Sequence, residues 1–115
     1  MPTIAQPGEI VLVRFPFTDL TTTKVRPAVV LATHGDDLTI VGVFSTLPQP
    51  LQGTWLVLSD QDPHFAATGL KTTSVVKAER LAVIEQSLVV RRIGVLSPEQ
   101  FQRLKEAVKR SLWLE

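Results

Sequence analysis

The sequence contains no cysteine and only two histidines among its 115 residues. Without cysteine, disulfides, thiolate nucleophiles and cysteine-based zinc sites are excluded, so any chemistry must use Arg, Lys, Ser, Thr, His or carboxylate side chains. No stretch approaches the ~18 uninterrupted apolar residues of a membrane span, and the first residues lack the pattern of a signal peptide. We therefore expect a cytoplasmic protein with no membrane partner.

An excess of one charge sign is also missing. Lys and Arg number 12 against 11 Asp and Glu, which gives a formal net charge of +1. The chain as a whole therefore carries no signal for binding a polyanion, and a nucleic-acid surface would have to be a local basic patch. No linker or low-complexity segment divides the sequence, so we expect residues 1–115 to form one domain.

Short segments rich in Val, Ile, Leu and Thr alternate with Gly, Pro, Asp and Thr over residues 1–95 and predict strands. The predicted strands cover residues 9–15, 27–32, 38–46, 54–59, 74–77 and 88–93. Because no helical pattern separates them, they favour a mainly β fold, either a small barrel or a sandwich, over a parallel α/β sheet. Residues 18–25 and 61–69 are predicted to be mobile loops.

The C-terminal segment changes to a helical pattern. Ser97 suits the N-cap of a helix, and Pro98 suits its first position. The apolar stripe expected on one face of this helix consists of Phe101, Leu104, Val108 and Leu112. We expect one amphipathic helix that covers an end of the barrel.

Arg26 stands between a polar, threonine-rich segment and the apolar run 28–31. With Pro27 fixing the backbone, an arginine here would hold its guanidinium rigidly against a phosphate. The alternative is a strand-end arginine paired with a carboxylate, which residue type alone favours. Ser45 and Thr46 end another predicted strand, where their hydroxyls can bind a phosphate or serve only in a turn.

The sequences that flank these residues resemble the MazF/PemK family of toxins from type II toxin-antitoxin systems. The resemblance rests first on GEIVLV at 8–13, FPFTD at 15–19 and RPAVV at 26–30. It continues through the strand that ends at Thr46, then GLK at 69–71, SVV at 74–76, RL at 80–81 and RRIGVLS at 91–97. The match spans nearly the whole chain.

This resemblance implies an SH3-like small barrel with a C-terminal amphipathic helix, a homodimer, and cleavage of single-stranded RNA at short sequence motifs. In that family the 2′-hydroxyl attacks the adjacent phosphorus and leaves a 2′,3′-cyclic phosphate, with no metal and no other cofactor. A cognate antitoxin is the second expected partner. A homodimer is also expected because a chain this small leaves apolar strand faces to cover.

Carried over position by position, the resemblance makes Arg26 the essential arginine and Ser45 the catalytic hydroxyl, with Thr46 next to it. The family commonly has threonine first, so either hydroxyl is a candidate for the phosphate contact. Glu79 falls where some members have an acid that can act as general base, and Lys77 falls where some have an arginine. An exposed Lys77–Glu79 pair without catalytic role is the equal alternative. Lys24, Lys77 and Thr18 are expected to contact RNA.

The remaining polar and aromatic candidates carry less information. His34 and His64 lie outside the matching motifs, so we expect neither to be catalytic, although His64 has a place in a loop that can touch RNA. Two histidines without clustered carboxylates also make a poor metal site. Trp55 and Trp113 can stack on bases, but burial in the core or in a dimer is the more common use.

Two other functions compete with RNA cleavage. A CcdB-like toxin of the same fold poisons DNA gyrase by binding, and the tail 112–115 is faintly similar to that class. The second competing function is that of a barrel that serves only as an interaction module and whose catalytic positions have decayed. Arg26, the two hydroxyls and the acid Glu79 together favour the nuclease. The RNA motif stays open, since the specificity loops, 19–25 and 47–54, follow no rule that we can apply.

Overall fold

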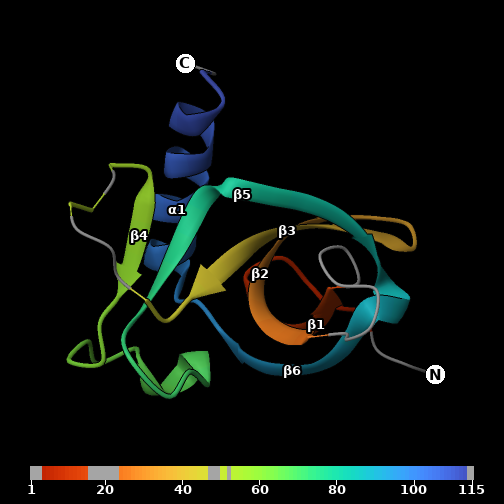
Figure 1. Cartoon of the computed structure of the whole chain (residues 1–115), viewed down its shortest axis with the longest axis horizontal. Coiled ribbons are helices and arrows are strands. Elements are labelled where there is room, and N and C mark those ends of the chain that lie inside the picture. Colours follow the sequence, from red (N-terminus) through yellow and green to blue (C-terminus); the bar gives the residue numbers. More distant parts are fainter. Residues whose placement is uncertain (1–3, 16–23, 47–49, 52, 114–115) are drawn as a thin grey trace.

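The fold is an open antiparallel sheet with one helix at its C-terminal end (Figure 1). The structure is a computed structural model that describes residues 4–15, 24–46, 50–51 and 53–113. The strands are β1 (Glu9–Phe15), β2 (Lys24–His34), β3 (Asp37–Phe44), β4 (Trp55–Leu58), β5 (Ser74–Glu85) and β6 (Val89–Val95). They follow the order β4-β5-β3-β2-β1-β6, and the sheet does not close on itself.

Two short 3₁₀ helices, η1 (Ala66–Thr68) and η2 (Gln86–Leu88), interrupt the connections, and α1 (Pro98–Ser111) follows β6. The mainly β fold with a C-terminal helix is therefore confirmed. No helix in the described part of the chain is long and apolar enough to span a membrane.

Strand boundaries differ from the sequence prediction at three places that matter for the site. The predicted strand 27–32 extends to Lys24–His34, so Arg26 lies within β2 and pairs with Val13, and does not precede the strand. The predicted strand 74–77 extends to Ser74–Glu85. The predicted strand 38–46 ends instead at Phe44, which leaves Ser45 and Thr46 beyond it.

Pro27 is tolerated inside β2 because the ladder between β2 and β3 ends at the residue next to it. The last paired residues of that ladder are Ala28 and Gly42, so residues 24–27 of β2 are paired with β1 only. A proline, which has no N–H to donate, is found at such edges of a sheet. Arg26 therefore lies in a segment of β2 that is paired with β1 but no longer with β3.

The long strand β5 turns a corner in its middle, visible in Figure 1. Its start pairs with β4 up to Trp55–Lys77, and its end pairs with β3 from Leu81 onward. Between the pairs Val41–Leu81 and Val43–Val76, the single residue Gly42 of β3 faces the four residues 77–80 of β5. This bulge bends the strand and brings Lys77, Glu79 and Arg80 to the corner.

Apolar side chains fill both faces of the sheet. The first cluster lies between the sheet and α1 and includes Ile10, Val29, Val41, Leu104 and Val108. The second lies on the opposite face, inside the curve of the sheet, and consists of Ala5, Val11, Val13, Ala28, Val30, Leu38, Ile40 and Ile84. Alternation along β2 assigns Val29 to the first cluster and Ala28 and Val30 to the second.

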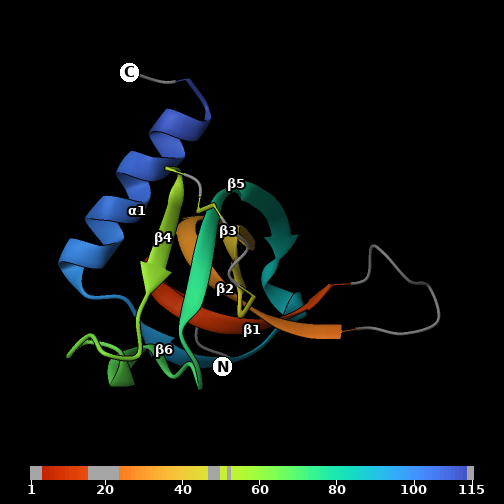
Figure 2. The same ribbon diagram turned by 60° about the vertical axis from the view of Figure 1, so that its left-hand side comes forward.

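The helix begins as the sequence predicts. The Ser97 hydroxyl accepts from the Gln100 backbone N–H at 3.1 Å, and the Gln100 side chain accepts from the Ser97 N–H at 2.9 Å, which completes a capping box. Leu104 and Val108 are buried and Phe101 is half-buried. The prediction is wrong for Leu112, which lies at the C-cap and is 48% exposed. Figure 2 shows α1 running alongside β4.

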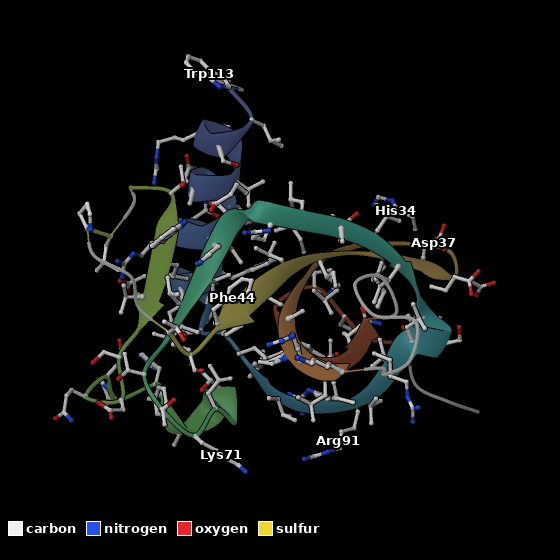
Figure 3. The ribbon with its side chains drawn as sticks, in the orientation of Figure 1. His34, Asp37, Phe44, Lys71, Arg91 and Trp113 are labelled. Atoms are coloured by element: carbon white, nitrogen blue, oxygen red, sulfur yellow. The ribbon has the colours of Figure 1, made fainter. Side chains whose placement is uncertain are left out.

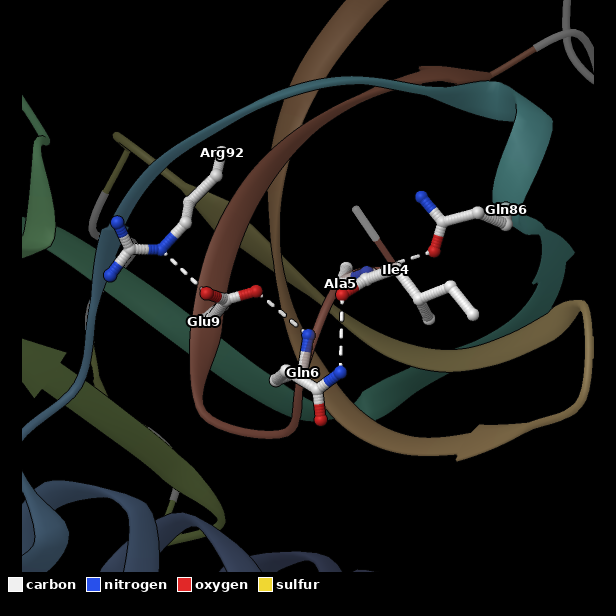
Figure 4. A network of polar contacts seen from close by, with 6 residues as sticks. All are labelled: Ile4, Ala5, Gln6, Glu9, Gln86 and Arg92. Atoms are coloured by element: carbon white, nitrogen blue, oxygen red, sulfur yellow. Dashed lines mark hydrogen bonds and ion pairs between the residues drawn. The ribbon is translucent and has the colours of Figure 1, made fainter. Parts of the chain in front are cut away.

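Polar contacts fasten the N-terminal segment to the sheet (Figure 4). The Ala5 N–H donates to Gln86 Oε1 at 3.0 Å, and the Gln6 N–H donates to Glu9 Oε1 at 2.7 Å. Glu9 also pairs with Arg92 Nε at 2.6 Å. This is the only ion pair among the residues that the structure describes, so the segment ahead of β1 is held mainly by hydrogen bonds.

Candidate functional site

Arg26 lies in the part of β2 that is next to the end of β3. Arg26 and Phe44 occupy the register positions two residues beyond the Ala28–Gly42 pair, on β2 and β3 respectively. Strand alternation puts Arg26 and Lys24 on the same face as Ala28, which belongs to the second cluster. Arg26 is exposed and makes no ion pair with another described residue. Its guanidinium is therefore available at the open end of this face.

Ser45 and Thr46 continue the chain from Phe44 and are both exposed. Because β3 ends at Phe44 and the ladder with β2 ends at Gly42, the two hydroxyl residues leave the sheet at the same end as Arg26. The structure thus brings Arg26, Ser45 and Thr46 to one end of the sheet. It does not decide which hydroxyl faces a ligand.

Phe44 lies over Gly42, since a methyl group built on Gly42 would come within 3.0 Å of the Phe44 ring. The same methyl position is 3.6 Å from Arg80 Cβ. A glycine opposite the β5 bulge therefore leaves room for both the phenyl ring and the arginine. Gly42 therefore lies close to both the Phe44 ring and the Arg80 side chain.

Lys77 lies between two aromatic rings. Its ammonium nitrogen is 4.7 Å from the centre of the Phe44 ring and 4.7 Å from the Trp55 ring. An ammonium ion over an aromatic face is attracted by the negative face of the ring. Trp55 and Lys77 are also direct cross-strand partners in β4 and β5. These contacts hold a long, flexible side chain at the corner.

Glu79 is held by the same tryptophan. The Trp55 indole N–H donates to both carboxylate oxygens of Glu79, at 3.0 and 2.9 Å, and the Thr54 hydroxyl lies 3.4 Å from one of them. Glu79 is exposed. It forms no ion pair with Lys77 or with any other described cation. Glu79 is thus an oriented, accessible carboxylate, which differs from the exposed Lys–Glu pair considered as the alternative.

We call this region the corner surface; it consists of Arg26, Phe44, Trp55, Lys77, Glu79 and Arg80. It carries three cationic side chains and one carboxylate, and Lys24 lies next to it on β2. A local basic surface therefore exists on a chain whose net charge is only +1. Such a surface, with the half-buried rings of Phe44 and Trp55 in it, can bind a phosphate chain and contact bases.

Other predicted residues lie elsewhere. Thr18 falls outside the described residues. His34 and Asp37 are partners at the opposite end of the β2–β3 ladder from Phe44, as Figure 3 shows, and His64 is exposed in a turn where its N–H donates to Asp62 Oδ1. Across the described segments, no three His, Asp or Glu side chains gather as metal ligands would.

Sequence reasoning missed the part played by two aromatic residues. Phe44 was not singled out, and Trp55 was expected in the core or a dimer. Trp55 is half-buried and contacts Lys77 and Glu79, whereas Trp113 is 90% exposed at the end of α1 (Figure 3). The available sequence signal for Trp55 was the spacing of Lys77 and Glu79, which are two residues apart on a strand that pairs with the strand containing Trp55.

The comparisons with known proteins identify the family of the chain. Residues 6–112 match the sequence profile of the PemK-like, MazF-like toxins of type II toxin-antitoxin systems. The chain belongs to this family. Among curated proteins, no sequence matches the chain.

Solved structures show the same fold at low sequence identity. The Mycobacterium tuberculosis toxin MazF-mt6 is 22% identical, with a TM-score of 0.73 over 93% of this chain and 98% of that one. MazF from a Deinococcus radiodurans MazE-MazF crystal is 14% identical, with a TM-score of 0.75 over 99% and 100%. A mycobacterial endoribonuclease in complex with its cognate antitoxin is 16% identical, with a TM-score of 0.72 over 96% and 97%. The comparisons give no support to a CcdB-like gyrase poison.

Proposed function

We propose that this toxin is a metal-independent endoribonuclease that cleaves single-stranded RNA at short motifs and leaves a 2′,3′-cyclic phosphate. The observation that supports it most is the corner surface, which combines the cations Arg26, Lys77 and Arg80 with one carboxylate oriented by Trp55. Membership of the MazF-like family and solved neighbours that are named endoribonucleases favour RNA as the substrate.

The reaction that we propose needs three groups. Glu79 accepts the proton of the 2′-hydroxyl, whose oxygen attacks the adjacent phosphorus. The bond from phosphorus to the 5′-oxygen breaks, and that oxygen takes up a proton to leave as a hydroxyl. The guanidinium of Arg26 stabilises the charge that grows on the phosphoryl oxygens, and a hydroxyl of Ser45 or Thr46 orients them.

The other basic residues bind the RNA on either side of the scissile phosphate. Lys24 lies two residues from Arg26 on β2, and Lys77 and Arg80 lie on β5. Each such contact adds affinity that decreases with salt and carries no sequence information by itself. Thr18 remains a proposed RNA contact, and the loops 19–25 and 47–54 remain proposals for base selection.

Purified protein incubated with mixed-sequence single-stranded RNA in EDTA tests the function. We expect cleavage at a short motif, with cyclic phosphate at one end and a 5′-hydroxyl at the other. Mapping the ends by ligation and phosphatase sensitivity identifies both groups. Activity that disappears in EDTA and returns with magnesium would contradict metal independence, while no cleavage in either buffer would contradict the nuclease.

The proposed partners follow from the same surface. We propose a homodimer, to be checked by light scattering at micromolar concentration, where a monomer would contradict it. We also propose an acidic, partly disordered antitoxin whose C-terminal segment lies along the RNA groove, because a basic groove that attracts phosphate attracts carboxylates too. The solved neighbours include a toxin in complex with its cognate antitoxin. A complex that leaves Arg26 fully open to solvent would overturn the shared groove.

A further inference from the structure

We propose that Trp55 is a positioning residue that holds Lys77 and Glu79 apart and directs both toward the same phosphate. This inference rests on the proposed ribonuclease function. It assigns a role to a side chain that does not itself take part in proton transfer or in charge stabilisation. The contacts that carry this role join residues of β3, β4 and β5.

The polar edge of Trp55 fixes the carboxylate. Its N–H lies 3.0 Å from Glu79 Oε1 and 2.9 Å from Oε2, so one donor is shared by both oxygens. A shared donor sets the plane of the carboxylate as well as its position. A carboxylate has about four acceptor positions, two on each oxygen. Oε1 also accepts from the Thr54 hydroxyl at 3.4 Å, so Oε2 is the oxygen that keeps a free position to receive the 2′-hydroxyl proton.

The face of Trp55 fixes the ammonium group. Lys77 Nζ is 4.7 Å from the centre of the indole ring and equally far from the Phe44 ring on β3. Lysine is otherwise a flexible side chain with about 2 kcal/mol of rotamer entropy. Two ring faces limit that freedom and leave the ammonium protons free to donate to a phosphate.

The arrangement also prevents Lys77 and Glu79 from neutralising each other's charge. Lys77 and Glu79 are two residues apart on one strand and carry opposite charges, yet they form no ion pair in the described structure. Trp55 contacts the ammonium with its face and the carboxylate with its edge. A direct ion pair would occupy the proton acceptor and the phosphate-binding cation with each other. Trp55 replaces that pair and leaves both groups free for substrate.

Three replacements at Trp55 separate the two contacts. In Trp55→Phe a ring remains for Lys77 but the N–H is lost, so kcat is expected to fall about tenfold with KM changed less than about twofold. Replacement by 3-benzothienylalanine, which keeps the indole shape with sulfur in place of N–H, is expected to give the same result. Trp55→Leu removes the aromatic face as well, so KM is expected to rise in addition. Trp113→Phe is the matched control, since Trp113 is 90% exposed and outside the corner surface.

A double-mutant cycle with Glu79→Gln distinguishes positioning from general support of the fold. If Trp55 acts through Glu79, Trp55→Phe lowers kcat by less than about twofold in the Glu79→Gln background. A structural role would give the same fractional loss in both backgrounds and a matching fall in Tm. Equal losses, or no loss from Trp55→Phe alone, would overturn the inference while wild-type cleavage leaves the proposed function intact. Absence of cleavage by the wild-type protein would overturn both.

Discussion

Replacing Arg26 with alanine should abolish cleavage and leave the fold unchanged. Arg26 is exposed and has no carboxylate partner among the described residues, so no ion pair is lost. Exposed substitutions of this kind change the free energy of unfolding by about 0.5 kcal/mol or less, which for a chain of this size is a Tm shift of about 2 °C. Loss of one preorganised charge donor costs ~100- to 1000-fold in rate, about 3–4 kcal/mol.

Single-turnover cleavage and thermal unfolding, measured on the same Arg26→Ala preparation, check both numbers. Arg14→Ala is the matched control, because Arg14 is an exposed arginine on β1 that pairs with Val25 and so lies on the opposite face of the sheet from Arg26. We expect the control to cleave at the wild-type rate. Arg26→Lys should recover little, because an ammonium cannot reproduce the planar fork that contacts two phosphate oxygens.

The opposite pattern would refute the reasoning. If Arg26 serves as a strand-end partner of a carboxylate, its truncation lowers Tm and leaves the cleavage rate near that of the wild type. A Tm loss of more than about 4 °C, with cleavage within about threefold of wild type, would remove Arg26 from the site.

Three predictions concern the fold and are read out as the free energy of unfolding in urea. Gly94→Ala should destabilise by about 3 kcal/mol or more, because a methyl there would lie 2.2 Å from the Thr68 backbone; no loss would show that η1 can move away. Ser97→Ala should cost about 1 kcal/mol by opening the capping box, whereas Pro98→Ala should cost less. Leu104→Ala should cost about 2–5 kcal/mol, since Leu104 is a fully buried residue of α1 in the first cluster; a loss below about 1 kcal/mol would contradict that packing.

Much of the fold could be predicted because buried strands and caps leave local patterns. The apolar runs of β1 and β3 and the Ser97–Gln100 cap are encoded within a few residues of sequence. The second half of β5 was missed because Ala78, Glu79 and Arg80 are not β-formers, and pairing with β3 resumes only beyond them. The early start of β2 was missed because Pro27 marks a strand boundary in most sequences.

The candidate site depended on contacts that no local pattern contains. Arg26, Lys77 and Glu79 were proposed through the family resemblance, whereas Trp55 was not, because the Glu79 carboxylate that its indole contacts is 24 residues away in sequence. Only the β4–β5 register puts that ring beside Lys77 and Glu79. Likewise, the room that Gly42 leaves for Phe44 depends on a bulge four residues long on the facing strand.

The bulge in β5 also separates two kinds of evolutionary change. The pairs that flank it, Val41–Leu81 and Val43–Val76, set the hydrophobic register of the sheet. Of the residues inside the bulge, Ala78 is buried in the first cluster, whereas Glu79 and Arg80 are exposed and Lys77 is half-buried. Under the proposed function, Lys77, Glu79 and Arg80 meet the substrate, so the preferred RNA can diverge at these three positions while the architecture stays constant. That separation agrees with solved neighbours that keep TM-scores of 0.72–0.75 at 14–22% identity.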